Sequence, residues 1–126
     1  MRHRLTRRAD EDIEHILVET LRAFGPRQMQ TYAALIDRAI ALVAEAPERA
    51  SSQGRPDLAS GIRSFHIALA SGRRRGASHV LYFTLTDAAE DDREVVILRV
   101  LHDRMEPRLR LATGGEGSED ETSSDP

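Results

Sequence analysis

Histidine, tyrosine and arginine are the side chains of this 126-residue chain that could take part in acid–base or phosphate chemistry. The candidate proton-transfer groups are His66, His79, Tyr82 and His102. The cations that could hold a phosphate are Arg63, Arg99 and Arg104. The chain contains no cysteine, which excludes thiol catalysis, a disulfide framework and cysteine-based zinc sites.

Most of these side chains also have a structural interpretation. Arg63 and Arg99 lie inside predicted strands, where ion pairing with an acidic residue of a helix is the simpler explanation. His66 and His79 flank one predicted hairpin, which favours surface or cross-strand contacts, and no third ligand at helical spacing supports a metal site. His102 follows an apolar strand, so it fits either a hydrogen-bonding strand end or a functional contact.

Acidic residues are concentrated at the end of the sequence. Residues 112–126 carry five acidic residues and no basic one: Glu116, Glu119, Asp120, Glu121 and Asp125. Removing these five from the 21 acidic residues leaves 16 against 18 basic residues, about +2 in place of the overall −3. We expect residues 1–111 to form the folded domain and residues 112–126 to be a disordered acidic tail, whether solubilising or shielding the basic body.

The length and composition suit a single small domain. With 126 residues and 40% hydrophobic content, two domains would be crowded. No run of about 18 apolar residues could cross a membrane. The basic first residues lead into acidic ones and not into the apolar stretch of a signal peptide. We therefore expect a cytoplasmic protein with no membrane contact.

Two helices joined by a tight turn are predicted after a brief strand at Arg2–Thr6. Thr6 offers a hydroxyl as an N-cap, and apolar residues then recur at spacings of three and four as far as Phe24. Gly25 and Pro26 are typical of a helix end followed by a new helix start. The second helix is expected to run to about Ala46, which makes a helical hairpin.

Three further strands are predicted at Ile62–Leu69, His79–Thr86 and Glu94–Leu101, because these segments alternate or are rich in β-branched and aromatic residues. Their short polar connections favour antiparallel pairing, and Tyr82 is expected at the core or its edge. The fold class is therefore α+β: an N-terminal strand, a two-helix hairpin, then a three-stranded antiparallel sheet, in two layers.

A helical hairpin can cover only one face of such a sheet. We therefore expect an exposed apolar face that would bind a partner, drawn from Phe65, Ile67, Tyr82, Val96 and Leu98 or their alternates.

Three strings resemble one known family. They are Leu5-Thr6-x-x-Ala9-x-x-Asp12-Ile13-x-x-Ile16, Gly61-Ile62-Arg63-Ser64-Phe65-His66, and the run from Ile97 through Leu101-His102-Asp103-Arg104-Met105-Glu106 to Pro107. Together with the order of elements they resemble the ParE/RelE toxin superfamily, specifically its ParE branch, over about residues 3 to 111. The resemblance implies a RelE-like fold.

The same resemblance implies a type II toxin that inhibits or poisons DNA gyrase when free and is neutralised by a ParD-type antitoxin. The alternatives are a RelE-like ribosome-dependent endoribonuclease of messenger RNA, and an inactive member that only binds antitoxin. RelE-like sites typically use lysines, and all 18 basic residues here are arginines, whose pKa above about 12 makes them poor titrating bases. We therefore favour binding over catalysis and expect no catalytic residue.

Contact roles are assigned on the same basis. The residues expected to contact the target are His102, Arg104 and Met105. The residues expected to contact the antitoxin are Arg63, Phe65, Ile67, Tyr82, Leu98 and Arg99. No cofactor or metal is expected, and the functional assembly is expected to be a hetero-oligomer with the antitoxin, which in such a complex can bind operator DNA.

Overall fold

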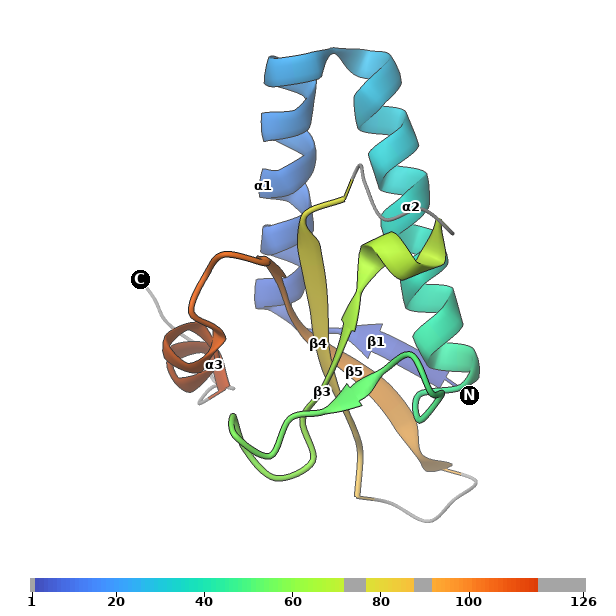
Figure 1. Cartoon of the computed structure of the whole chain (residues 1–126), viewed down its shortest axis with the longest axis vertical. Helices are drawn as coiled ribbons and strands as arrows, with labels where there is room; N and C mark the ends of the chain where they lie inside the picture. The colour runs from blue at the N-terminus through green and yellow to red at the C-terminus, as the bar shows by residue number, and fades with distance from the viewer. Residues whose placement is uncertain (1, 72–76, 88–91, 116–126) are drawn as a thin grey trace.

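The computed structural model describes residues 2–71, 77–87 and 92–115. It confirms the predicted α+β class: a mixed sheet carries a helical hairpin on one face and a short C-terminal helix near the other (Figure 1). The three consecutive arginines at 73 to 75 and the acidic residues from Glu116 onward lie outside the described residues.

The helical hairpin forms as its capping residues predict. The first helix, α1, spans Arg7–Phe24, and the backbone N–H of Ala9 donates to Thr6 Oγ1 at 3.0 Å. The second helix, α2, spans Pro26–Glu45. Gly25 joins the helices with φ of +92°, a conformation that glycine adopts without the strain a Cβ would add.

The sheet has five strands, two more than the predicted antiparallel set. They are β1 (Arg2–Leu5), β2 (Gln53–Gly54), β3 (Arg63–His66), β4 (His79–Leu85) and β5 (Glu94–His102). Their order is β1-β5-β4-β3-β2, and β1 pairs with β5 in parallel while the other neighbours are antiparallel. The N-terminal strand thus joins the same sheet at its edge, beside the last strand in sequence.

The predicted strand Ile62–Leu69 is too long. After His66 the chain turns into the 3-10 helix η1, Ile67–Ala70. The backbone N–H of Ala68 donates to His66 Nδ1 at 3.2 Å, so the histidine side chain caps the turn. An apolar alternation cannot distinguish such a turn from a continuing strand, because both bury alternate residues.

The main core lies between the helical hairpin and the sheet. It contains the fully buried Phe83, Leu81 and Ile97 from the strands and Ile36 and Val43 from α2. The helical faces predicted from the apolar spacing pack here, except at the end of α1, where Leu21 and Phe24 of the predicted stripe are exposed. This layer fixes α1 and α2 against the sheet and so positions every side chain that projects from them.

Part of the expected exposed sheet face does not exist. Phe65 and Ile67, 2% and 0% exposed, lie in the core on the helical side. Tyr82 and Val96 are also buried. Tyr82 packs with Leu101 and with Leu111 of the C-terminal helix α3 (Pro107–Gly115), and partly buried Leu98 joins them. The prediction of exposure is therefore wrong for these buried residues. Phe65 and Ile67 face the helical hairpin, whereas Tyr82 is covered by α3. This helix also includes residues 112–115, which were expected to be disordered.

Exposed apolar side chains remain at the end of the helical hairpin. Figure 1 shows the joined ends of α1 and α2 projecting beyond the labelled strands. Val18, Leu21 and Phe24 are 39%, 41% and 72% exposed there. We call these three residues the hairpin patch. Within the described residues, no helix is long and apolar enough to cross a membrane.

Candidate functional site

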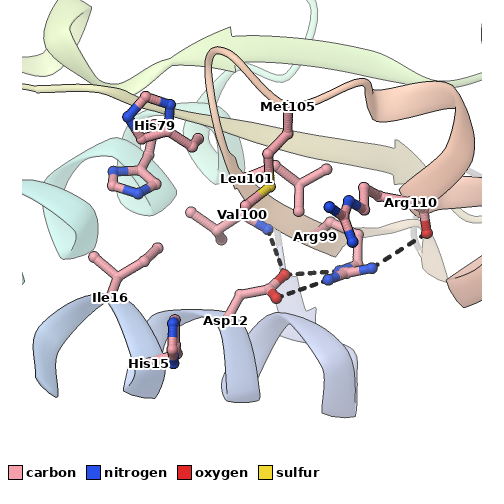
Figure 2. Close-up of a pocket in the computed structure, with 10 residues that line it drawn as sticks. Asp12, His15, Ile16, His79, Arg99, Val100, Leu101, Met105 and Arg110 are labelled. Carbon is pink, nitrogen blue, oxygen red and sulfur yellow. Dashed lines mark hydrogen bonds and ion pairs between the residues drawn. The ribbon is translucent and has the colours of Figure 1, made fainter. Parts of the chain in front are cut away.

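A small cavity of about 140 Å³ lies where α1, the end of β5 and α3 meet (Figure 2). Its walls combine apolar, aromatic and charged side chains: Asp12, His15, Ile16, His79, Arg99, Val100, Leu101, His102, Met105 and Arg110. Two of the three residues expected to contact the target, His102 and Met105, belong to this set. The cavity is therefore the place in the described structure where the predicted target-contact residues meet other functional side chains.

One wall of the cavity is a buried ion pair between Asp12 of α1 and Arg99 of β5. The Arg99 guanidinium donates from Nε to Asp12 Oδ2 at 2.8 Å and from Nη2 to Oδ1 at 2.9 Å. The side chains are 14% and 12% exposed, respectively. The backbone N–H of Val100 also donates to Asp12, and Arg99 Nη1 donates to the carbonyl of Arg110 at 3.2 Å. This group, the Asp12–Arg99 clamp, ties α1, β5 and α3 together, and it confirms the predicted pairing of Arg99 with a helical acid.

A second wall is formed by His79, which is neutral at ordinary pH. Burial, and to a smaller extent the neighbouring His102, lower the pKa of His79 to about 4. The backbone N–H of Ser78 donates to Tyr32 Oη at 3.0 Å, which leaves the tyrosine hydroxyl to donate to His79 Nδ1, 2.7 Å away. The hydrogen bond therefore favours the tautomer of His79 that carries its proton on Nε2.

Histidines and one carboxylate cluster at the end of the sheet. His66 Nε2 lies 3.0 Å from Asp103 Oδ2, and this bond is the main reason that the pKa of Asp103 is held below its usual value. The rings of His79 and His102 meet edge to face with centroids 5.3 Å apart. The backbone N–H of Arg104 donates to His102 Nδ1 at 3.1 Å, so this nitrogen is an acceptor. His102 thus has the strand-end hydrogen bond that the sequence left as one of two options.

The turn after β5 brings the predicted target-contact residues together. The N–H of Asp103 donates to Ser78 O at 2.7 Å, and the N–H of Met105 donates to His102 O at 2.9 Å. Arg104 is exposed, and Met105 is 41% exposed at the cavity. His102, Arg104 and Met105 therefore form one continuous surface on a turn held by backbone hydrogen bonds, which we call the turn surface.

The residues expected to contact the antitoxin do not form one surface. Arg63 donates to the carbonyl of Pro47 and, from Nη2, to Ser52 Oγ at 2.7 Å, so it braces the segment after α2. The predicted ion pair between Arg63 and an acidic residue of a helix is therefore wrong. Phe65 and Ile67 lie in the main core, Tyr82 and Leu98 in the cluster under α3, and Arg99 in the clamp.

The sequence analysis missed several residues of the site, above all Tyr32, His15 and Arg110. Tyr32 lies on α2, and its hydroxyl partners are 46 and 47 residues away in the sequence. Nothing in the local pattern marks such long-range contacts. His15 and Arg110 had no motif around them.

Two of the three cations that the sequence offered as phosphate ligands, Arg63 and Arg99, are not available beside the site's histidines. Arg63 pairs in register with Phe83, four positions along β4 from His79, which is roughly 13 Å at strand spacing. The guanidinium of Arg99 is occupied by Asp12, which leaves only Arg104 among the candidate cations exposed near the histidines. In the described part of the chain, no group of three or more histidine, cysteine or acidic residues is placed to hold a metal ion.

Comparison with known proteins gives two matches. The family described as "ParE toxin of type II toxin-antitoxin system, parDE" matches residues 4–107. The chain is also 31% identical over 109 residues to "Toxin ParE1" of Caulobacter vibrioides, covering 86% of this chain and 96% of that protein. The match includes the Asp12–Arg99 clamp and the turn surface. The acidic residues from Glu116 onward lie beyond the part of the chain that the family matches.

Proposed function

The chain belongs to the ParE toxin family of type II toxin-antitoxin systems, and from this premise we propose that it inhibits or poisons DNA gyrase when free and is neutralised by a ParD-type antitoxin. It acts by holding its target in a bound state and forms no covalent bond. A toxin with such a target and such an antitoxin acts in the bacterial cytoplasm, and we propose that location for this chain.

The observation that carries this proposal is the dispersal of the groups a ribonuclease would have to bring together. Cleavage of RNA without a metal requires a base, an acid and cations converging on one phosphate. Arg63 is bound to Ser52, Arg99 is bound to Asp12, and Tyr82 is buried under α3. Among the histidines that lie together, His66 is bonded to Asp103 and His79 to Tyr32. Of the three candidate cations, Arg104 is the exposed one on their turn.

The turn surface is the proposed target contact. An exposed arginine and an exposed methionine on a rigid turn are the residue types that contribute most at protein interfaces, because both combine apolar area with adaptable contacts. The Asp12–Arg99 clamp and the backbone bonds of Asp103 and Met105 hold this surface in place without taking part in it. A target could therefore bind with little reorganisation of the toxin.

The hairpin patch is the proposed antitoxin contact, in place of the sheet residues that the structure buries. Phe24 is 72% exposed, and apolar side chains gathered at one end of a helical hairpin favour a partner segment that covers them. Phe24 lies eight residues beyond Ile16, the last cavity residue of α1, which is about 12 Å along a helix. The two proposed contacts are therefore separate, and substitutions can tell them apart.

The first experiment expresses the chain without antitoxin in a host with intact gyrase and follows growth, DNA breaks and transcript integrity in one culture. DNA breaks with intact transcripts support the proposal. Cut transcripts with intact DNA would favour the ribonuclease alternative, and normal growth with folded protein would leave an inactive antitoxin-binding member.

Paired variants sharpen the experiment. Arg104→Gln with Met105→Ala is expected to relieve growth arrest while antitoxin binding stays within about twofold. Phe24→Ser with Leu21→Ser is expected to weaken antitoxin binding at least about tenfold, since two large apolar contacts are lost, and to leave the arrest intact. Glu48→Gln, an exposed position beyond the other end of α2, is the control for both. If both pairs changed the same property, the assignment of separate surfaces would be wrong.

A further inference from the structure

Basic and titratable side chains surround the mouth of the cavity, and the proposed function uses only some of them. His15 of α1 and Arg110 of α3 approach it from different elements (Figure 2). With His102, which also lines the cavity, and Arg104, an exposed residue of the same turn that does not line it, they make up what we call the basic rim. Asp12, the carboxylate inside the cavity, is neutralised by Arg99, and Asp103 of the same turn is bound to His66. Glu106 of that turn is exposed, and so is Asp103.

Asp103, on the same turn as Arg104, interacts electrostatically with that arginine without forming an ion pair with it. Among the described residues, no ion pair involves the side chain of Arg104 or Arg110, whereas exposed Arg7 and Arg22 each pair with a glutamate of their own helix. The apolar floor beneath the rim, formed by Ile16, Leu101 and Met105, reduces competition from water for an anion at its edge. The rim thus presents unpaired positive charge beside a partly enclosed space.

The same chain carries the complementary charge a short distance away. Residues 116–126 hold five acidic and no basic residues. Gly115, the last residue of α3, is five residues beyond Arg110, about 8 Å along a helix. A chain of six residues spans up to about 20 Å when extended, so the acids at 119 to 121 can reach the rim.

We propose that the basic rim binds the acidic residues 116–126 of its own chain, so that this segment competes with whatever else binds the turn surface. Covalent connection gives the segment an effective concentration of about millimolar, so contacts that would be weak between separate molecules suffice. A partner protein must compete with that concentration. Because the family match ends at residue 107, this device would be a property of the present chain and not of the matched region.

The competition with a target rests on the proposed function, whereas binding of the segment to the rim does not. In the free toxin, residues 116–126 would then partly cover the turn surface until a tighter-binding partner displaces them. Exposed ion pairs contribute little individually, so two or three contacts predict a several-fold effect and not complete inhibition.

The test compares the full chain with a full-length neutral variant carrying Glu116→Gln, Glu119→Gln, Asp120→Asn, Glu121→Gln and Asp125→Asn. NMR would record the ring signals of His15 and His102 and the side-chain signals of Arg104 and Arg110. We expect these signals to differ between the two proteins at low salt and to converge in about 0.5 M salt, where charges are screened within about 4 Å. No difference at low salt would overturn the proposal.

A peptide of residues 116–126 provides the second measurement. Added to the neutral variant at millimolar concentration, the peptide should shift the NMR signals of the same four residues toward their values in the full chain. A peptide in which Gln and Asn replace the five acidic residues should not. Arg110→Gln in the neutral variant should weaken this binding about threefold, and the control Arg27→Gln should not. Shifts at other residues would contradict the proposed site. Equal binding of the peptide with Gln and Asn would contradict recognition of its acidic side chains. These readouts need neither gyrase nor antitoxin, so a failed toxicity assay leaves their outcome intact.

Discussion

Replacing Asp12 by asparagine should be the most damaging conservative change on the surface of α1. The carboxylate accepts two hydrogen bonds from Arg99, at 2.8 and 2.9 Å, and a third from the N–H of Val100. Asparagine is similar in size but carries no charge, and its amide nitrogen would face a donor. The arginine, whose side chain is only 12% exposed, would be left with its charge largely uncompensated.

The magnitude follows from that burial. Removing one partner of a buried ion pair costs about 3 to 5 kcal/mol, and the remaining exposure of both groups places Asp12→Asn near about 3 kcal/mol. For a domain of this size, such a loss lowers the melting temperature by roughly 10 °C. Because Arg99 Nη1 also donates to the Arg110 carbonyl, we expect α3 to loosen and the cavity to widen.

Urea unfolding followed by circular dichroism measures this effect. Glu11→Gln is the matched control: it removes an acid one residue away, whose ion pair with Arg7 is 3.5 Å long and largely exposed, and it should cost less than about 0.5 kcal/mol. Replacing both Asp12 and Arg99 by leucine should recover at least half of the loss, since the uncompensated charge disappears. Equal unfolding midpoints for Asp12→Asn and Glu11→Gln would refute the reasoning.

The remaining predictions concern pH and the helical turn. The pKa of His79 falls from 6.5 when exposed to about 4 in the folded protein, first because of burial and then because of His102, so folding favours its neutral form. The resulting stability is fully present above pH 6.5 and is lost as the pH falls from about 6.5 to 4. His79→Gln should therefore flatten this part of the curve of unfolding free energy against pH, measured by urea unfolding. An unchanged slope would contradict the assignment to His79. Gly25→Ala should lower the free energy of unfolding by about 1 kcal/mol or more, because φ is +92° there and nothing lies within 4 Å of the added Cβ, so the cost is backbone strain alone. A melting temperature equal to that of the unchanged protein would count against that strain.

The helical hairpin was predictable because its signals are local. Thr6, Gly25 and Pro26 mark the helix ends by their own backbone and capping preferences, and apolar spacing marks the buried faces. The cores of β4 and β5 were predictable for the same reason, since β-branched and aromatic residues favour strands. The strings of the ParE resemblance were also visible in the sequence, and the family match over residues 4–107 confirms them.

The candidate site was only partly predictable. The turn surface could be named because His102, Arg104 and Met105 are close in sequence, although their role stays a prediction. The cavity beside them could not, since it depends on His15, His79 and Arg110, which come from three different elements.

The sequence by itself determined the α+β class, the helical hairpin and the family, because each depends on short-range pattern or on matched strings. Only the tertiary structure decided which face each strand residue occupies. Alternation says that neighbours point to opposite faces, but not which element covers each face, and so Phe65 and Ile67 are buried under the helices. Likewise Asp12 and Arg99 are 87 residues apart in the sequence. Their ion pair forms because α1 packs beside β5, and this packing depends on the whole fold and not on any local segment.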